Sequence, residues 1–402
     1  MKLNPNIMPS YLQFKKEEIE RKGGLHTALE IEGQPVLWKE IYGLVLSQKK
    51  SLLRFMSPLF ADTSLRIILT GAGSSAFIGE AAQGIVQSNT KRITHAIATT
   101  DLITHPKLHF IKEMPTLLVS FARSGNSPES LAAVQLANEY CDTVFHLIIT
   151  CNPQGELMKN NLPNTYELVL PESANDKSLA MTGSFTGMLL SVILISKINL
   201  LETFLPSLQV LMSEASELTG KHLASIKAIA EQPYERVVFL GSGPLLAIAR
   251  ECHLKLQELT DGKVICKHDS FLGFRHGPRA VVSKGTLIVY LLSSDEHVLL
   301  YERDLCLSID ADARNIPTVS YNHYIKNLKN SVLTITFSQP AKPTNELAFI
   351  SATLIGQLLG FYQSIYLGLR PDNPSKSGSI SRVVQGVTIY PVLPLLKSSS
   401  SF

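Results

Sequence analysis

Apolar runs rich in Val, Ile and Leu alternate along residues 50–200 with stretches in which apolar positions recur at helical spacing. The runs predict strands at 65–70, 116–121, 144–150 and 166–170. The helical stretches predict helices at 75–88, 128–140 and 181–200. Buried strands separated by helices are typical of a parallel sheet that is covered on both faces. We therefore predict an α/β fold built on a mostly parallel sheet.

The same pattern starts again after Pro233. An apolar strand at 236–240 runs into the turn Gly241-Ser242-Gly243, and a long helix is predicted over 245–260. A second strand at 286–292 then ends in a serine-containing turn. The order of elements matches that around Gly71-Ala72-Gly73 in the first half. The restart therefore indicates two copies of one α/β unit.

A chain of 402 residues is too long for one ordinary core and predicts two domains with extensions. Residues 1–45 have mixed charge and helix-forming composition, with a break at Gly23-Gly24. A helix is predicted near 206–232, ahead of the second copy. We expect four parts: a helical N-terminal extension (1–45), a first domain (46–215), a second domain (216–390) and a C-terminal tail (391–402).

The segment 347–369 carries no charged residue, so it has to be weighed against a membrane span. It also contains hydroxyl and amide side chains, and glycines at 356, 360 and 368. Lipid would leave the amides without partners, whereas an interior helix can satisfy them against its neighbours. We expect a helix buried on most sides, in the protein interior or at a subunit contact.

Composition narrows the class of protein further. Hydrophobic residues make up 45% of the chain and charged residues 18%, which is typical of a globular protein. The net charge is only +3, and Lys and Arg are spread along the chain, which argues against nucleic-acid and membrane partners. The five cysteines show no CxxC spacing and are expected to be free buried thiols. The N-terminus lacks a signal-peptide pattern, so a cytoplasmic location is expected.

Two turns in the first half favour binding of a phosphate. The turn 71–75 contains Ser74 and Ser75, and the turn 122–130 contains Arg123, Ser124 and Ser127. Each turn lies between a predicted strand and a predicted helix, so hydroxyls and backbone N–H groups should meet at a helix N-terminus, which attracts anions.

The matching turn in the second half differs in charge. After Ser293-Ser294 it carries Asp295 and Glu296, which would repel a phosphate. We expect this second turn to be a plain helix-capping turn, and only the first half to hold the anion.

The predicted helix after Gly243 carries Glu251, Lys255 and Glu258 at i, i+4 and i+7, and hence on one face. Two interpretations are open. The face could be exposed to solvent and carry an ordinary ion pair. Alternatively, because the surrounding residues are apolar, the helix could be packed inside the protein with a carboxylate placed to shuttle protons.

Two further segments contain candidate chemistry. His276 precedes Gly277-Pro278, where the backbone turns and the ring can project, although a lone loop histidine is more often a surface residue. His253, His268 and Cys266 lie in the same region, but without the HExxH or CxxC spacing of a metal site, and no metal is expected. The turn-rich stretch 370–379 is either a simple tail or a loop that closes over a site.

Four strings, in this order and spacing, resemble the sugar isomerase (SIS) family in its tandem two-domain form: Gly71–Ala76, Phe121–Ser130, Phe274–Pro278 and Arg370–Ser375. The resemblance covers roughly residues 45–390. It is strongest to the AgaS type, described as galactosamine-6-phosphate deaminase/isomerase or tagatose-6-phosphate ketose/aldose isomerase. The implied fold is two tandem SIS domains, each a parallel sheet flanked by helices.

The isomerase half of glucosamine-6-phosphate synthase is a more distant relative, and it implies roles. Its catalytic helix matches Glu251, Lys255 and Glu258, with Glu258 at the general base that moves a proton between C1 and C2. His276 matches a histidine implied in ring opening, which the neighbouring subunit supplies in that family. The substrate-binding residues expected on this basis are Gly73, Ser74, Ser75, Arg123, Ser124, Gly125, Asn126, Ser127 and Thr182.

The chain departs from the synthase in three ways. Ala122 replaces a phosphate-site serine, so Arg123 or Ser74 is expected to compensate. Gln385 falls where the synthase has a tail lysine, which puts a tail-lysine role in doubt. No glutamine-hydrolysing domain precedes the first unit, so ammonia from glutamine is not expected by that route.

The resemblance implies an enzyme that converts D-galactosamine 6-phosphate and water to D-tagatose 6-phosphate and ammonia. No metal or organic cofactor is expected, since the open-chain imine or carbonyl itself acidifies the adjacent C–H. A homodimer or larger homo-oligomer with shared active sites is expected. A plain ketose/aldose isomerase of tagatose 6-phosphate and a non-catalytic sugar-phosphate sensor are the alternatives, although sensing alone needs neither Glu258 nor His276.

Overall fold

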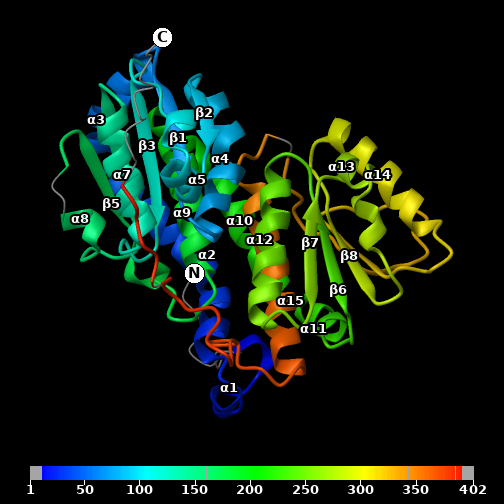
Figure 1. Ribbon diagram of the computed structural model, residues 1–402. Helices are drawn as coiled ribbons and strands as arrows, with labels where there is room; N and C mark the ends of the chain where they lie inside the picture. The colour runs from blue at the N-terminus through cyan, green and yellow to red at the C-terminus, as the bar shows by residue number, and fades with distance from the viewer. Residues whose placement is uncertain (1–10, 160–161, 343, 385, 392–402) are drawn as a thin grey trace, which may run out of the picture.

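Two parallel five-stranded sheets form the framework of the protein (Figure 1). The structure is a computed structural model that describes residues 11–159, 162–342, 344–384 and 386–391. The predicted tail 391–402 and the first ten residues of the predicted extension therefore lie almost entirely outside the described residues.

The first sheet has the order β2-β1-β3-β4-β5, and each neighbouring pair is parallel. Its strands are β1 (Arg66–Thr70), β2 (Ile93–Ala96), β3 (Thr116–Ala122), β4 (Val144–Thr150) and β5 (Thr165–Val169). In register, Thr70 at the end of β1 lies beside Ser120 of β3. The turns that follow β1 and β3 therefore leave the sheet next to each other.

The second sheet, in the order β10-β9-β8-β6-β7, repeats the first. Its strands are β6 (Arg236–Leu240), β7 (Ile265–Asp269), β8 (Thr286–Leu291), β9 (Thr318–Tyr321) and β10 (Ser331–Ile335). Numbered within its own half, each sheet has the order 2-1-3-4-5, which is a common doubly wound arrangement. The predicted duplication and the α/β fold are confirmed.

Helices surround both sheets and fill the space between them (Figure 1). Those of the first half are α1 (Lys16–Lys22), α2 (Leu25–Ser47), α3 (Lys49–Ala61), α4 (Ser74–Thr90), α5 (Thr99–Thr104), α6 (Pro106–His109), α7 (Pro128–Tyr140), α8 (Glu156–Lys159) and α9 (Gly183–Ser196). Those that follow are α10 (Leu205–Thr219), α11 (Leu223–Ala230), α12 (Pro244–Leu259), α13 (Phe271–Phe274), α14 (Glu296–Asp310) and α15 (Thr353–Tyr366). Figure 1 shows α2, α4, α9, α10, α12 and α15 between the two sheets.

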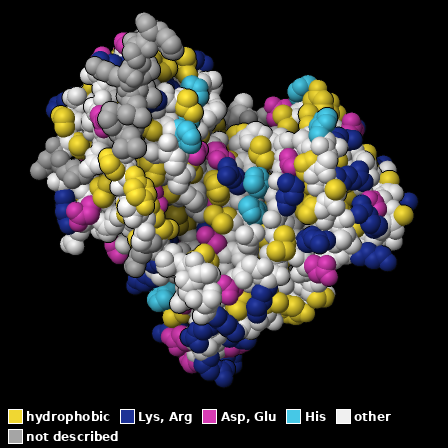
Figure 2. Space-filling model, in the orientation of Figure 1, with side chains coloured by type: hydrophobic (Ala, Val, Ile, Leu, Met, Phe, Trp, Pro, Cys, Tyr) yellow, Lys and Arg dark blue, Asp and Glu magenta, His cyan; other side chains and the backbone are white. Residues whose placement is uncertain are grey.

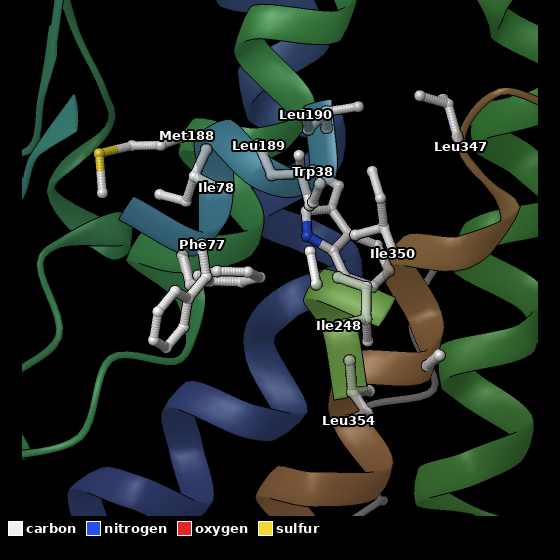
Figure 3. Close-up of a cluster of buried hydrophobic side chains, with 14 of the residues drawn as sticks. Trp38, Phe77, Ile78, Met188, Leu189, Leu190, Ile248, Leu347, Ile350 and Leu354 are labelled. Carbon is white, nitrogen blue, oxygen red and sulfur yellow. The ribbon is translucent and has the colours of Figure 1, made fainter. Parts of the chain in front are cut away.

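One hydrophobic core is shared by both sheets. Strand residues alternate between faces, so Ile67 of β1 joins this inner cluster whereas Ile68 joins a smaller outer cluster beneath α5 and α7. Trp38 of α2 lies in the middle of the shared core, near Ile248 of α12 and Ile350 (Figure 3). Its indole N–H donates to the Thr186 hydroxyl at 3.0 Å. The described part of the N-terminal extension is thus helical, as predicted, and it also contributes to the core.

The predicted uncharged helix is confirmed as an interior element. A short 3-10 turn (Ala348–Ala352) leads into α15, and together they form the one helix among the described residues that is long and apolar enough to span a membrane. Of the residues in the apolar window of that segment, 83% are buried inside the protein. The helix packs most closely on α12, because Gly356 and Gly360 let the two backbones approach.

Some predicted elements differ from those observed. The predicted helix 206–232 is two helices, α10 and α11, which are separated at Gly220. Strands β2, β7, β9 and β10 were not predicted. β2, β7 and β10 are edge strands with exposed positions, so none has a continuous buried run, and β9 is buried but contains only four residues. The five cysteines are free and buried, as predicted. The predicted boundaries at 45/46 and 215/216 stay predictions.

Candidate active site

A cavity of about 110 Å³ opens where β1 and β3 end. These strands are neighbours although α4 and β2 lie between them in sequence, so their turns diverge and leave a crevice, the usual ligand site of such sheets. Five of the predicted substrate-binding residues line it: Ser75, Arg123, Ser124, Gly125 and Ser127. The two predicted phosphate turns therefore meet at one place.

Glycines shape the two turns. Gly73 has φ 57°, which an L side chain rarely adopts, and it begins α4 so that Ser74 and Ser75 occupy the first helical positions. Gly125 has φ 66°, and a Cβ there would come within 3.1 Å of the Gly155 backbone. Ser127 caps α7 by accepting the N–H of Ser130 at 3.2 Å. Two helix N-termini and several hydroxyls are thus placed around the cavity.

Arg123 supplies the positive charge of the cavity. Its side chain is buried, and its guanidinium donates to the carbonyl oxygens of Leu179 and Arg382. Within the described part of the chain it forms no ion pair. Burial lowers the pKa of Arg123, and the charge of Asp176 opposes that shift. A buried cation without a bonded carboxylate is well placed to receive an anion.

The carboxylate helix is packed inside the protein and does not present a solvated face. The side chains of Glu251 and Lys255 are 0% and 1% exposed, and that of Glu258 is 22% exposed. Lys255 Nζ lies 3.4 Å from Glu251 Oε1 and 2.6 Å from Glu258 Oε2. The solvent-exposed interpretation of this helix is therefore wrong.

A hydrogen bond joins the carboxylate helix to the phosphate turns. The Ser74 hydroxyl donates to Glu251 Oε1 at 3.1 Å, across 177 residues of sequence. Glu251 Oε2 is buried and has no hydrogen-bond partner among the described residues. The Ser74 hydroxyl thus binds a carboxylate and does not line the cavity, so it does not replace the serine that the synthase has at the position of Ala122. Arg123, by contrast, lines the cavity.

Burial dominates the electrostatics of the carboxylate helix. It raises the pKa of Glu251 from an ordinary 4.5 to about 7, against the attraction of Lys255. Burial alone would lower the pKa of Lys255, but the charges of Glu251 and Glu258 outweigh it and raise that pKa. The row Glu251–Lys255–Glu258 therefore holds a fixed cation between two carboxyl groups, one of which titrates near neutral pH.

Three predicted site residues lie away from the cavity. His276 follows α13 and is exposed, and its imidazole makes no hydrogen bond or ion pair within the described residues. Asn126 accepts the N–H of Glu156 at 2.9 Å and so begins α8. Thr182 is fully buried and donates to Asp176 Oδ1 at 2.8 Å. Their predicted contacts with substrate stay predictions.

A C-terminal strap (residues 370–384) covers one side of the cavity. Asp372 anchors it by accepting the N–H of Thr27 at 2.8 Å, and Arg382 donates to the Asp176 carbonyl at 2.7 Å. Arg382, Val383 and Val384 then line the cavity. Gln385, the position of the doubtful tail lysine, lies outside the described residues.

Sequence reasoning missed Arg382 and Glu129, which both line the cavity. Glu129 follows Pro128 in the first turn of α7, so from sequence it is an ordinary helix-start acid. Arg382 lies in a serine-rich stretch that also contains Lys376. Nothing local in the sequence distinguishes it as a site residue.

Charged side chains of both signs are interspersed on the face shown in Figure 2, and histidines are visible on both lobes. His253 and His268 form a stacked pair with ring centroids 5.0 Å apart. Burial lowers the pKa of His268 to about 4. No group of three or more metal-binding side chains occurs among the described residues.

Comparison with known proteins places these features in a family. The SIS domain family matches residues 59–196. The D-galactosamine-6-phosphate deaminase AgaS of Shewanella sp. (strain ANA-3) is 39% identical over 390 residues, 95% of this chain and 96% of that protein.

Solved structures of similar proteins lead to the same family. One from Clostridium novyi, assigned provisionally as a tagatose-6-phosphate ketose/aldose isomerase, is 37% identical with a TM-score of 0.91, over 96% of this chain and 100% of that one. The tagatose-6-phosphate ketose/aldose isomerase of Escherichia coli is 34% identical with a TM-score of 0.83, over 92% and 98%. The two sheets, the serine turns and the overall likeness lead to one conclusion: the chain belongs to the AgaS family of SIS-domain proteins.

Proposed function

We propose that the protein is a cytoplasmic deaminating isomerase that converts D-galactosamine 6-phosphate and water to D-tagatose 6-phosphate and ammonia. The observation that carries the proposal is the buried row Glu251–Lys255–Glu258, which is hydrogen-bonded to Ser74, the neighbour in sequence of the cavity residue Ser75. The AgaS relative from Shewanella bears the name of this activity.

The first half would hold the substrate. Its phosphate fits the cavity next to Ser75, Ser124 and Ser127, where two helix N-termini and the buried Arg123 favour an anion. The sugar would then extend toward α12. Arg123 lies within range of the charges of the carboxylate row, which supports a single site for the phosphate and the sugar.

The carboxylate row would move the proton. Glu258 is the partly exposed member and is held by Lys255, so it can reach the substrate, whereas Glu251 is enclosed. In the open-chain sugar, Glu258 would take the proton from C2 and return it to C1. A second proton passes from the amine nitrogen to O1, so that the C1 aldehyde becomes an alcohol and the C2 amine becomes an imine. Water adds to the imine, and ammonia leaves as the C2 ketone forms.

Ring opening would require a second subunit. The His276 ring is exposed and makes no hydrogen bond or ion pair within the described residues. We infer a homodimer or larger homo-oligomer in which His276 of the partner subunit reaches the cavity. This is the arrangement implied by the resemblance to glucosamine-6-phosphate synthase.

A plain ketose/aldose isomerase is the second candidate, since a structural relative carries that name. It would use the same proton transfer and release no ammonia. Parallel assays of galactosamine 6-phosphate, glucosamine 6-phosphate and tagatose 6-phosphate separate the two. We expect ammonia from galactosamine 6-phosphate, and less from its C4 epimer. Interconversion of tagatose 6-phosphate with its aldose, without ammonia from either amino sugar, would favour the plain isomerase. No turnover of any of the three would favour a sugar-phosphate sensor.

A further inference from the structure

A second cavity, of about 240 Å³, lies at the corresponding place in the second half. It opens where β6 and β8 end, and these strands are neighbours at the point where the order of the second sheet reverses. Open α/β sheets bind ligands at such points. The duplicated fold therefore contains two crevices. We assign the serine turns and the carboxylate row to the first crevice only.

The lining of the second cavity excludes a phosphate and favours a cation. Among the described residues, its lining contains no Lys or Arg but includes Asp295 and Glu346. Glu346 is paired with Lys197 at 2.5 Å. Asp295 forms no ion pair among the described residues, and its Oδ1 caps α14 by accepting the N–H of His297 at 2.8 Å. Its carboxylate charge is thus exposed at the mouth of the cavity without a cationic partner.

Polar side chains connect the segments around this cavity. Asn322, which follows β9, has φ 80°, and its amide donates to the carbonyl of Leu292 and the hydroxyl of Ser294, both at 3.2 Å. Fully buried Glu302 accepts the N–H of Ser293 at 2.8 Å and also interacts with the side chain of Ser242, which lines the cavity. Residues at positive φ other than glycine cluster at ligand-binding sites.

Apolar side chains form the remaining wall. Tyr321, Phe349 and Leu245 line the cavity together with the serines and asparagines. A cavity lined by both apolar side chains and hydroxyl and amide groups suits a sugar ring, which has C–H faces and a hydroxyl rim. We propose that this cavity binds an unphosphorylated hexosamine, with the protonated amine next to Asp295. The inference does not depend on the proposed reaction.

A ligand here would contact both helices that build the active site. Pro244 and Leu245 begin α12, two turns before Glu251, and Ile85 belongs to α4, which starts at the serine turn 73–75. Glu346 accepts a hydrogen bond from Asn89 of α4 at 2.8 Å. Occupation of the second cavity can therefore alter the relative position of α4 and α12, and with it the Ser74–Glu251 contact.

Titration calorimetry of the full chain with D-galactosamine tests the proposal. Three variants locate the binding: Asp295→Asn, which keeps a capping oxygen but removes the charge; Ala348→Trp, which fills the cavity; and Arg123→Met, which alters only the first cavity. D-Galactose, which lacks the amine, is titrated in parallel. Thermal unfolding of each variant shows that it is folded.

We expect the wild-type chain and Arg123→Met to bind galactosamine with similar affinity. Asp295→Asn should bind it about tenfold more weakly, and should lose the preference for galactosamine over galactose. Ala348→Trp should not bind. No binding to the wild-type chain would overturn the proposal. So would loss of binding in Arg123→Met with full binding in Ala348→Trp or Asp295→Asn, because the amino sugar would then occupy the first cavity.

Discussion

Lys255 is the residue on which the proposed chemistry depends most. A lysine that is 1% exposed would be costly without partners, and it is stabilised by a carboxylate on each side, at 3.4 and 2.6 Å. The ammonium in turn lets two acidic groups lie within one buried site. Glu251 is enclosed and hydrogen-bonded to Ser74, whereas Glu258 is partly exposed, so two chemically identical side chains have different roles.

The raised pKa of Glu251, about 7 against 4.5 in the unfolded chain, predicts a pH effect on stability. Between these values the folded state holds a proton that the unfolded state has lost, so stability falls as pH rises through this window. Glu251→Gln does not titrate and should lose less stability between about pH 5 and about pH 8. Denaturant midpoints of both chains measure the difference. An equal pH dependence would contradict the prediction. Glu30 and Glu214, whose pKa values are also raised by burial, titrate alike in both chains.

Arg123 permits a test of the anion cavity. Arg123→Met keeps an apolar side chain of similar length but removes the only cation that we assign to the phosphate. We expect KM for the sugar phosphate to rise roughly 10- to 100-fold with a smaller change in kcat, because a charge-assisted contact is lost in binding. Arg123→Lys should recover part of the loss. Steady-state kinetics with unchanged KM in Arg123→Met would place the phosphate elsewhere.

Several of these residues could be recognised from the sequence because the patterns that indicate them span only a few neighbouring residues. A serine after a strand and before a helix, or three charged residues on one helical face, are patterns within ten residues. The Ser74–Glu251 bond joins positions 177 residues apart, and the contact of Arg382 with Asp176 joins positions 206 apart. Such contacts depend on how the two halves pack, which periodicity does not describe.

At the scale of elements, helix α12 joins the second cavity and the carboxylate row to the shared core. Its first turn lines the second cavity, its middle carries the carboxylate row, and its opposite face packs on α15. The contact with α15 is unusually close, since a Cβ on Gly356 would overlap the Cys252 backbone and come within 2.8 Å of its Sγ. The position of the carboxylates thus depends on a glycine a hundred residues away.

We expect Gly356→Ala to destabilise the protein by about 1–3 kcal/mol, because overpacking forces the two helices apart. The activity of the folded variant should also fall, since α12 carries Glu258. Gly33→Ala is the matched control: it lies within α2, a Cβ there would meet nothing within 4 Å, and it should be neutral or stabilise by up to about 1 kcal/mol. Equal unfolding midpoints for both variants would contradict the close packing of α12 and α15.

Long buried strands are more predictable than short ones for a physical reason. β3 is buried at all seven positions and five of its residues are apolar, so its sequence indicates a strand. Edge strand β2 contains only four residues, of which Ile93 and His95 are exposed. Its strand conformation depends on pairing with β1, which a local pattern does not reveal.

At the scale of the whole molecule, the two duplicated halves contribute different parts of the proposed active site. The first sheet carries the anion cavity, and the second half supplies the carboxylate row and, at an exposed position, His276. A single chain therefore has every proposed catalytic group, but His276 does not contact the others within it. The proposed partner subunit would complete the site.

Mixing two inactive variants tests the shared site. Glu258→Gln and His276→Ala remove different groups, and a mixed dimer would contain one site with both groups intact. We expect co-refolded chains to recover roughly a quarter of wild-type activity, since half of the dimers are mixed and each has one intact site of two. Each variant refolded alone is the control. No recovery in verified mixed dimers would show that Glu258 and His276 act within one chain.

Ammonia release from galactosamine 6-phosphate by the wild-type chain and by Glu258→Gln tests the central claim most directly. The amide keeps the size of the side chain but cannot accept the C2 proton, so kcat should fall by about 10²–10⁴-fold with KM nearly unchanged. Unfolding midpoints of the two chains serve as the control for folding. Near-normal ammonia release by folded Glu258→Gln would contradict the role of the buried carboxylate row.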